Sequence, residues 1–279
     1  MFNNKLNIAV IWLVMMSCNT VHAGELLVGG SGTDISTMRI LAKAFKGQNP
    51  KINIKVLPSL GSSGGVKALA KGHLHIGLTS RALKPKERVL PLNAYLYAKT
   101  PLVFATNKNN QADSLSSKTY FKALGGTRQF WPDGQLIRLV LRPMSDSDTM
   151  IINKSYPQSK ATVKQGYLLK GIPIAATDQK AAVSLESIKG SLGTTTLSLI
   201  QSEKRSLKPL TLDNVAPSIN NLANGSYPMS KSLYLLLPES PDQAAIQFTK
   251  FIQSEKGSEI LRQTGHLPIP FKIKIDNET

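Results

Sequence analysis

Two glycine-rich turns, each set between a short apolar strand and a helix, constrain the fold of this chain more than any other feature. The first is GGSGT at residues 29–33, which precedes a helix predicted over residues 36–46. The second is the start of GSSGGVKALAKG at residues 61–72. It follows a strand predicted over 52–57 and leads into a helix predicted over 64–70. A repeated succession of strand, turn and helix predicts an α/β fold rather than a β-sandwich or a helical bundle.

The chain is predicted to form two lobes, and its last part is predicted to return to the lobe that its first part builds. With 279 residues, the chain is long enough to bury more than one core. We predict two lobes, the first made of residues 24–108 plus 227–279 and the second of residues 109–226, joined by two crossing segments. The remaining expected strands cover 75–79, 95–105, 136–141, 191–195 and 232–237, and the remaining helices cover 119–124, 179–188, 242–254 and 258–263.

The first 23 residues are typical of a cleavable signal peptide. Lys5 precedes the apolar run IAVIWLVMM at residues 8–16, and small residues flank position 22. That run is too short to span a membrane, which needs about 20 residues. We expect export to the periplasm as a soluble chain that begins at Gly24. Acylation of Cys18, the one cysteine, is the alternative, but the residues before it fit a lipoprotein signal poorly.

The charge is strongly basic, with 34 Lys and Arg against 17 Asp and Glu and a formal net charge of +17. The basic residues are scattered over successive elements, whereas a nucleic-acid binder gathers them on one helix or stripe. We therefore expect no nucleic-acid partner. The excess is interpreted as a solvated basic surface that attracts small anions through its long-range field.

The residues of the two turns favour an anion site. Gly64 and Gly65 let backbone N–H groups approach a ligand, Ser62 and Ser63 add hydroxyl donors, and a helix N-terminus adds partial positive charge. A capped helix with a glycine-rich entry is the structural alternative. If the two turns lie at the carboxyl ends of neighbouring strands, they converge on one crevice.

Four segments in order carry a resemblance to a known family. They are GGSGT followed by GSSGGVKAL, then IGLTSR at residues 76–81, FKALGGTRQFWPDGQLIRLVLRP at 121–143 and YPMSKSLYLLL at 227–237. Together they are similar to the phosphate-binding solute receptors of ABC transporters, the type II periplasmic binding proteins. The resemblance implies a two-lobed α/β fold with the ligand in the cleft between the lobes, a monomer, and an ABC permease as partner.

The resemblance also implies ligand contacts in the first lobe. It places Thr33 and the backbone of Asp34 in the first turn, Ser62 in the second, and Ser80 with Arg81 at the end of the third strand. Arg81 is expected to balance the charge of the anion through two hydrogen bonds.

In the second lobe this chain departs from the family pattern. Where the family has an arginine followed by a loop that ends in Ser-Gly-Thr, this chain has RPMSDSDT at residues 142–149. Arg142, Ser147 and Thr149 carry over as ligand contacts, but Asp148 replaces the glycine and Asp146 precedes Ser147. Two alternatives stay open: the two carboxylates face the anion and repel it, or they turn outward and cap the following helix.

Catalytic and metal functions fit the sequence less well. Residues 61–65 satisfy the G-x-S-x-G pattern of a serine hydrolase, with His266 as the histidine that follows in order. His73 and His75 have no third metal ligand nearby and are interpreted as a structural pair. We predict a binding protein for a tetrahedral oxyanion, with phosphate favoured, no catalytic step, no metal and no cofactor. A sensor or adhesion module of the same fold is the alternative.

Overall fold

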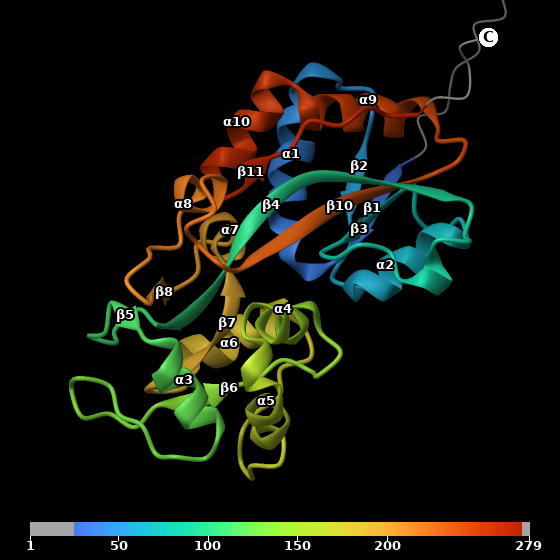
Figure 1. Cartoon of the computed structure of the whole chain (residues 1–279). Coiled ribbons are helices and arrows are strands. Elements are labelled where there is room, and N and C mark those ends of the chain that lie inside the picture. The colour runs from blue at the N-terminus through green and yellow to red at the C-terminus, as the bar shows by residue number, and fades with distance from the viewer. Residues whose placement is uncertain (1–24, 275–279) are drawn as a thin grey trace, which may run out of the picture.

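The strand–helix alternation predicted at the start of the chain is confirmed in the structure, a computed structural model that describes residues 25–274. The predicted signal peptide lies outside the described residues. We name the half of the molecule built on the following elements the first lobe (Figure 1). They are β1 (Leu26–Gly30), η1 (Gly32–Asp34), α1 (Ile35–Gln48), β2 (Ile54–Val56), α2 (Gly61–Ala70), β3 (Ile76–Thr79) and η2 (Pro85–Glu87).

The second half, the second lobe, follows the long strand β4 (Leu92–Asn107). It consists of β5 (Ser114–Leu115), α3 (Ser117–Leu124), β6 (Arg138–Val140), α4 (Ser147–Ser155), η3 (Pro157–Ser159), α5 (Lys160–Gly166), α6 (Asp178–Ser187), β7 (Ser191–Thr196), α7 (Leu197–Ser202), β8 (Leu207–Pro209), β9 (Thr211–Leu212) and α8 (Ile219–Ala223).

The chain then returns to the first lobe. The returning elements are β10 (Ser230–Pro238), α9 (Gln243–Gln253), α10 (Glu255–Gln263) and β11 (Leu267–Pro268). Strand β10 inserts between β3 and β4 and pairs antiparallel with both. The main path of the sheet therefore runs β2-β1-β3-β10-β4-β7-β6, with β8 and β11 pairing β4 beside it.

Strand β4 belongs to both lobes, as Figure 1 shows. Its first part pairs with β10, and its last part pairs with β7 and β8. The two lobes thus share one continuous sheet, and their hydrophobic cores lie at its two ends. In the first core, Phe45 of α1 contacts Phe248 and Phe251 of α9 edge to face.

The second core extends further along β4 than the sequence predicts. Leu102 and Phe104 precede residue 108 but pack with the second-lobe core, together with Tyr227 and Met229. We therefore propose that the division between the lobes falls within β4. No described helix has the length and apolar character that a membrane span requires.

Two differences from the sequence prediction bear on the site. Helix α2 begins at Gly61 instead of residue 64, so the glycine-serine segment is the first turn of the helix and not a loop before it. Helix α4 begins at Ser147, whereas the sequence offers a helix there, from residue 149, only in one of two alternatives. Both helices begin at the cleft between the lobes.

Candidate functional site

A cavity of about 230 Å³ lies between the two lobes. The first lobe contributes the first turn of α2 and the end of β3, including Ser62 and Ser80. The second lobe contributes the segment from Arg142 to Ser147 and the start of α6. Parallel strands β1 and β3 end at this edge, which is where open α/β sheets place their ligands.

Three helix N-termini meet at the cavity wall: α2 at Gly61, α4 at Ser147 and α6 at Asp178. The first N–H groups of a helix have no partner within the helix, and they carry partial positive charge. Helices that begin at one cavity therefore provide donors and a favourable potential for a negative ligand.

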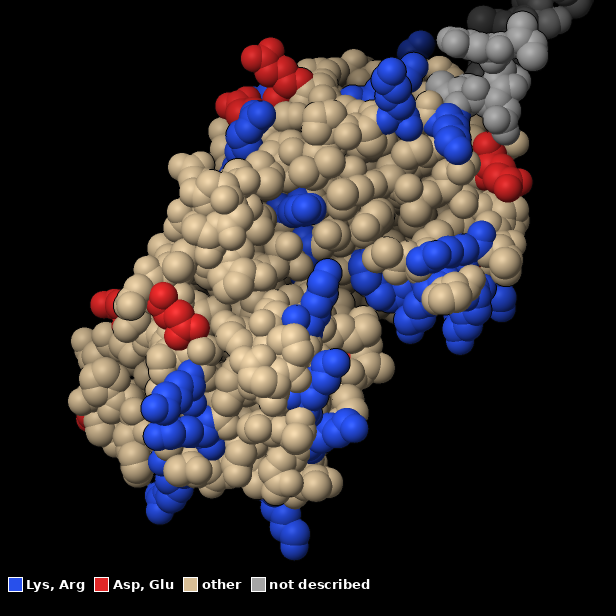
Figure 2. All heavy atoms as spheres, in the orientation of Figure 1, with Lys and Arg blue, Asp and Glu red and all other residues tan. Residues whose placement is uncertain are grey.

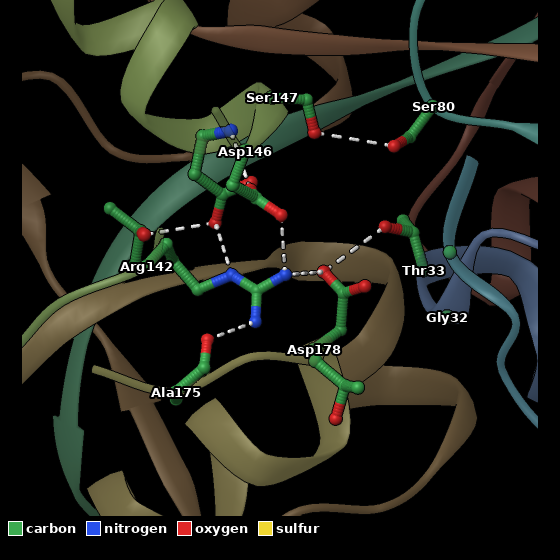
Figure 3. A network of polar contacts seen from close by, with 12 residues as sticks. Gly32, Thr33, Ser80, Arg142, Asp146, Ser147, Ala175 and Asp178 are labelled. Atoms are coloured by element: carbon green, nitrogen blue, oxygen red, sulfur yellow. Dashed lines mark hydrogen bonds and ion pairs between the residues drawn. The ribbon is translucent and has the colours of Figure 1, made fainter. Parts of the chain in front are cut away.

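Serine hydroxyls connect the lobes across the cavity. The Ser62 hydroxyl accepts a hydrogen bond from the Ser80 backbone N–H at 3.1 Å, and the two hydroxyls lie 3.2 Å apart. The Ser80 hydroxyl is in turn 3.3 Å from that of Ser147 on α4 (Figure 3). These hydroxyls can reorient to donate to an oxyanion.

The arginine of the second lobe, Arg142, lies behind the hydroxyls and is 4% exposed. Its Nη1 donates to the carbonyl of Ala175 at 2.8 Å, and its Nη2 donates to Asp146 Oδ2 at 2.8 Å. Asp178 Oδ1 is 3.6 Å from Nη2, and Asp148 Oδ2 is 3.9 Å from Nε. Three carboxylates thus surround this guanidinium, as Figure 3 shows in part.

A second buried cation, Lys231 of β10, completes the cluster. Its Nζ lies 2.6 Å from Asp148 Oδ1 and 3.1 Å from Asp178 Oδ1. It also donates to Thr33 Oγ1 at 3.2 Å. Burial works to lower the pKa of Lys231, but Asp148 and Asp178 raise it above its ordinary value. The lysine therefore stays charged and connects the crossing strand to both lobes.

The carboxylates of the cluster differ in their ionisation. Burial acts to raise the pKa of Asp178, yet Lys231 and Arg142 hold it below its ordinary value. For Asp146, burial and the neighbouring charge of Asp148 raise the pKa. Asp178 is consequently ionised at neutral pH, and Asp146 is the more readily protonated of the two.

Six of the predicted site residues line the cavity together: Ser62, Ser63, Ser80, Arg81, Arg142 and Ser147. Thr33 is buried beside the cavity, where its hydroxyl is 3.4 Å from Asp178 Oδ1. The backbone N–H of Asp34 is directed to the carbonyl of Ser31 at 3.4 Å within the 3-10 turn. The Thr149 hydroxyl lies 3.1 Å from the Pro143 carbonyl and away from the cavity.

Arg81 lines the cavity, and its guanidinium already has partners within the protein. Its guanidinium binds Glu87 through two hydrogen bonds of 2.7 and 2.8 Å, and it also donates to Ser63 at 2.9 Å. The hydrogen bonds from Arg81 hold the pKa of Glu87 below its ordinary value, so Glu87 is ionised. Glu87 thus balances the charge of Arg81, and the same guanidinium, which lines the cavity, also donates to Ser63.

Neither alternative describes both carboxylates, because Asp146 lines the cavity and caps α4 whereas Asp148 does neither. Asp146 does cap α4, because its Oδ1 accepts from the backbone N–H of Asp148 at 2.9 Å, but its other oxygen binds Arg142 instead of facing solvent. Asp148 is buried, paired with Lys231 and bonded to the Thr194 hydroxyl at 2.9 Å. The carboxylate that replaces the family's glycine therefore has its own cation.

Sequence reasoning missed Lys231 and Asp178 as members of the site. A charged residue within the apolar strand 230–238 is a signal for a buried partner, and Thr177 before Asp178 is a helix-start signal. Their pairing across 53 residues could not be read from the pattern.

The residues considered for a serine-hydrolase or metal site have other partners in the structure. His266 is buried, and its Nδ1 lies 3.1 Å from the Thr264 hydroxyl. Burial lowers its pKa to about 4. The hydrogen bonds of Ser62 and Ser63 go to Ser80 and Arg81 instead. His75 accepts from the backbone of Leu27, which fits its interpretation as structural. Among the described residues, no group of His, Cys, Asp and Glu could hold a metal ion.

Comparison with known proteins gives matches over most of the chain. The family described as PBP superfamily domain matches residues 19–256. The phosphate-binding protein PstS of Pseudomonas aeruginosa is 26% identical over 282 aligned residues, which cover 90% of this chain and 85% of that protein.

Solved structures agree with this result. A candidate phosphate ABC transporter substrate-binding protein from Clostridium perfringens, solved with bound phosphate, superimposes with a TM-score of 0.75 at 21% identity. An ABC-type phosphate transport receptor from Vibrio cholerae superimposes with a TM-score of 0.60 at 19% identity. Each alignment covers 88% of this chain and 100% of the other. At these identities the likeness shows a common fold.

Proposed function

The chain belongs to the PBP superfamily, and from that premise we propose that it is an exported phosphate-binding receptor that delivers its ligand to an ABC permease. The two-lobed α/β fold expected from the resemblance is confirmed. The observation that carries the proposal is the convergence of three helix N-termini, a chain of serine hydroxyls and Arg142 on one cavity. Relatives across most of the chain's length are named as phosphate-binding proteins.

In the proposed mechanism the protein binds and performs no chemical step. Phosphate enters the cavity and accepts hydrogen bonds from the hydroxyls of Ser62, Ser80 and Ser147 and from the first N–H groups of α2 and α4. Because these donors come from both lobes, the anion holds the lobes together. The closed receptor is the form that a permease would recognise.

The test is calorimetric titration of the mature chain with phosphate, sulfate and molybdate. We expect phosphate to bind, and we expect Ser62→Asp to abolish binding because it places a negative charge on the cavity wall. An acidic residue in the first turn of α2 is compatible with the helix.

Gln243→Glu is the matched control. It adds the same charge at the exposed start of α9, which is far from the cavity. Retained binding in this variant and lost binding in Ser62→Asp would support the site. If titration of the wild-type protein with phosphate releases or absorbs no heat, the proposed ligand is wrong. If both variants bind phosphate equally, the proposed location of the site is wrong.

A further inference from the structure

Two carboxylates, Asp146 and Asp178, line the cavity, and Asp178 is the one that reaches a side chain of the first lobe. Asp178 Oδ1 is 3.4 Å from Thr33 Oγ1, 3.1 Å from Lys231 Nζ and 3.6 Å from Arg142 Nη2. Thr33 and Arg142 are two of the contacts that the family resemblance assigns to the ligand. Figure 3 shows Asp178 between them, directed from the second lobe toward Thr33 of the first.

We propose that Asp178 is an internal competitor of the anion, which holds the lobes together when the cavity is empty and must give up its contacts when an oxyanion binds. This inference rests on the proposed function. A carboxylate oxygen and a phosphate oxygen accept from the same hydroxyl and guanidinium donors, so the two compete for Thr33 and Arg142.

The contacts of Asp178 join the two lobes. Thr33 lies in η1 of the first lobe, whereas Asp178 is the first residue of α6 in the second. The next residue, Gln179, donates to the carbonyl of Gly32 at 2.9 Å. The start of α6 is therefore fixed to the first lobe by two adjacent side chains.

The charges of the cluster explain why Asp178 must yield. Two cations, Arg142 and Lys231, face three carboxylates, those of Asp146, Asp148 and Asp178. Arg81 and Lys84 also line the cavity, but a phosphate placed beside all three carboxylates of the cluster would be repelled by them, which makes its free energy of binding less favourable. Withdrawal of the Asp178 carboxylate leaves Arg142 with Asp146 and Lys231 with Asp148, and it frees donors for the ligand.

The first experiment measures phosphate affinity in Asp178→Asn, which keeps the shape of the side chain and removes its charge. We expect phosphate to bind about tenfold more tightly, which is the effect of one unfavourable charge interaction of one pKa unit. Asp113→Asn is the control, because it removes an exposed carboxylate that pairs with Lys208 elsewhere in the second lobe. Weaker or unchanged phosphate binding in Asp178→Asn would overturn the competitor role.

The second experiment measures the radius of gyration by small-angle X-ray scattering in phosphate-free buffer. The wild-type protein should be compact without phosphate, Asp178→Asn should be expanded, and phosphate should restore the compact form in the variant. Asp178→Ser, with a melting curve for each protein, guards against a folding defect specific to the asparagine. An equal radius of gyration for the wild-type and variant proteins without phosphate would overturn the interlobe role.

The two experiments separate this inference from the proposed function. If neither the wild-type protein nor Asp178→Asn binds phosphate but the variant expands, the proposed ligand is wrong and the contact between the lobes stands. If both bind phosphate equally, the proposed ligand stands and the competitor role is wrong.

Discussion

At the scale of single residues, the least expected feature is Asp34, which is fully buried at the start of α1. The polar group that faces its carboxyl is the buried hydroxyl of Tyr97, which acts to lower the pKa of Asp34. Burial raises its pKa to about 8, although Lys231 acts in the opposite direction. The folded protein therefore keeps this carboxyl protonated at neutral pH, whereas the unfolded chain ionises it near pH 4.

This difference predicts a pH dependence of stability. Because the folded-state pKa is raised, the contribution of Asp34 is fully present below about pH 4 and is lost as the pH rises toward 8. In that range the free energy of unfolding falls by at most roughly 1.4 kcal/mol for each pH unit. Asp34→Asn cannot ionise, so its free energy of unfolding relative to the wild-type protein should grow between pH 5 and pH 8. Urea unfolding at several pH values measures this difference, and a constant difference would contradict the assignment.

The residues of the site were predictable to an unequal degree. Ser62, Ser63, Ser80 and Arg142 could be found because they lie next to strand ends and glycine turns, where local pattern and family resemblance agree. The neutralisation of Arg81 by Glu87 was not found, although only six residues separate them, because the pairing depends on the turn η2. Charge pairing is decided by three-dimensional proximity, which a linear pattern does not contain.

At the scale of elements, the position of α2 is set by close contact with the sheet. A Cβ on Gly65 would lie 2.7 Å from Gly30 Cα and 2.9 Å from the Leu78 carbonyl oxygen. The helix therefore needs a glycine where it crosses β1 and β3. Gly65 lies within the helix predicted over 64–70, whereas Gly61, with φ +68°, and the serines after it favoured a turn, so the prediction began the helix too late.

Gly65→Ala should consequently destabilise the protein. Overpacking against backbone atoms that cannot move aside costs about 1–3 kcal/mol. Gly47→Ala in α1 is the matched control, since nothing lies within 4 Å of its Cβ position and alanine favours a helix by about 0.5–1 kcal/mol. Denaturant unfolding of both variants should give free-energy changes of opposite sign. A Gly65→Ala variant as stable as Gly47→Ala would show that α2 can shift outward freely.

The helices that sequence reasoning missed are short or weakly patterned. Helices α7 and α8 have six and five residues, too few for an apolar period to repeat. Helix α4 has nine residues and depends on the cap from Asp146, which is one of two roles that the sequence allows for this carboxylate. The strands and long helices of the first lobe, by contrast, follow from their apolar spacing alone.

At the scale of the whole molecule, the formal charge of +17 surrounds a site of nearly balanced charge. Figure 2 shows Lys and Arg side chains gathered over the part of the first lobe that holds α2. Exposed Lys67 and Lys71 lie on and directly after this helix. Their field should speed the arrival of anions more than it strengthens their binding.

The association rate of phosphate should therefore fall several-fold as the salt concentration rises from low to physiological, because counter-ions screen these charges. The double variant Lys67→Glu with Lys71→Glu should lower the association rate and leave the dissociation rate nearly unchanged. Lys250→Glu on α9 should leave both rates nearly unchanged. Stopped-flow fluorescence of a dye on Ser145→Cys, at the exposed rim of the cavity, measures both rates. A salt-independent association rate would contradict steering by the surface.

The insertion of β10 between β3 and β4 has a consequence for how the protein is made. Until residues 230–238 have left the ribosome, β3 and β4 each have an open edge and the first lobe has no complete sheet. The nascent chain thus holds its amino-terminal third unfinished through most of translation. For the exported receptor that we propose, such late completion would leave the chain unfolded enough to pass through a secretion channel and would postpone folding to the far side of the membrane.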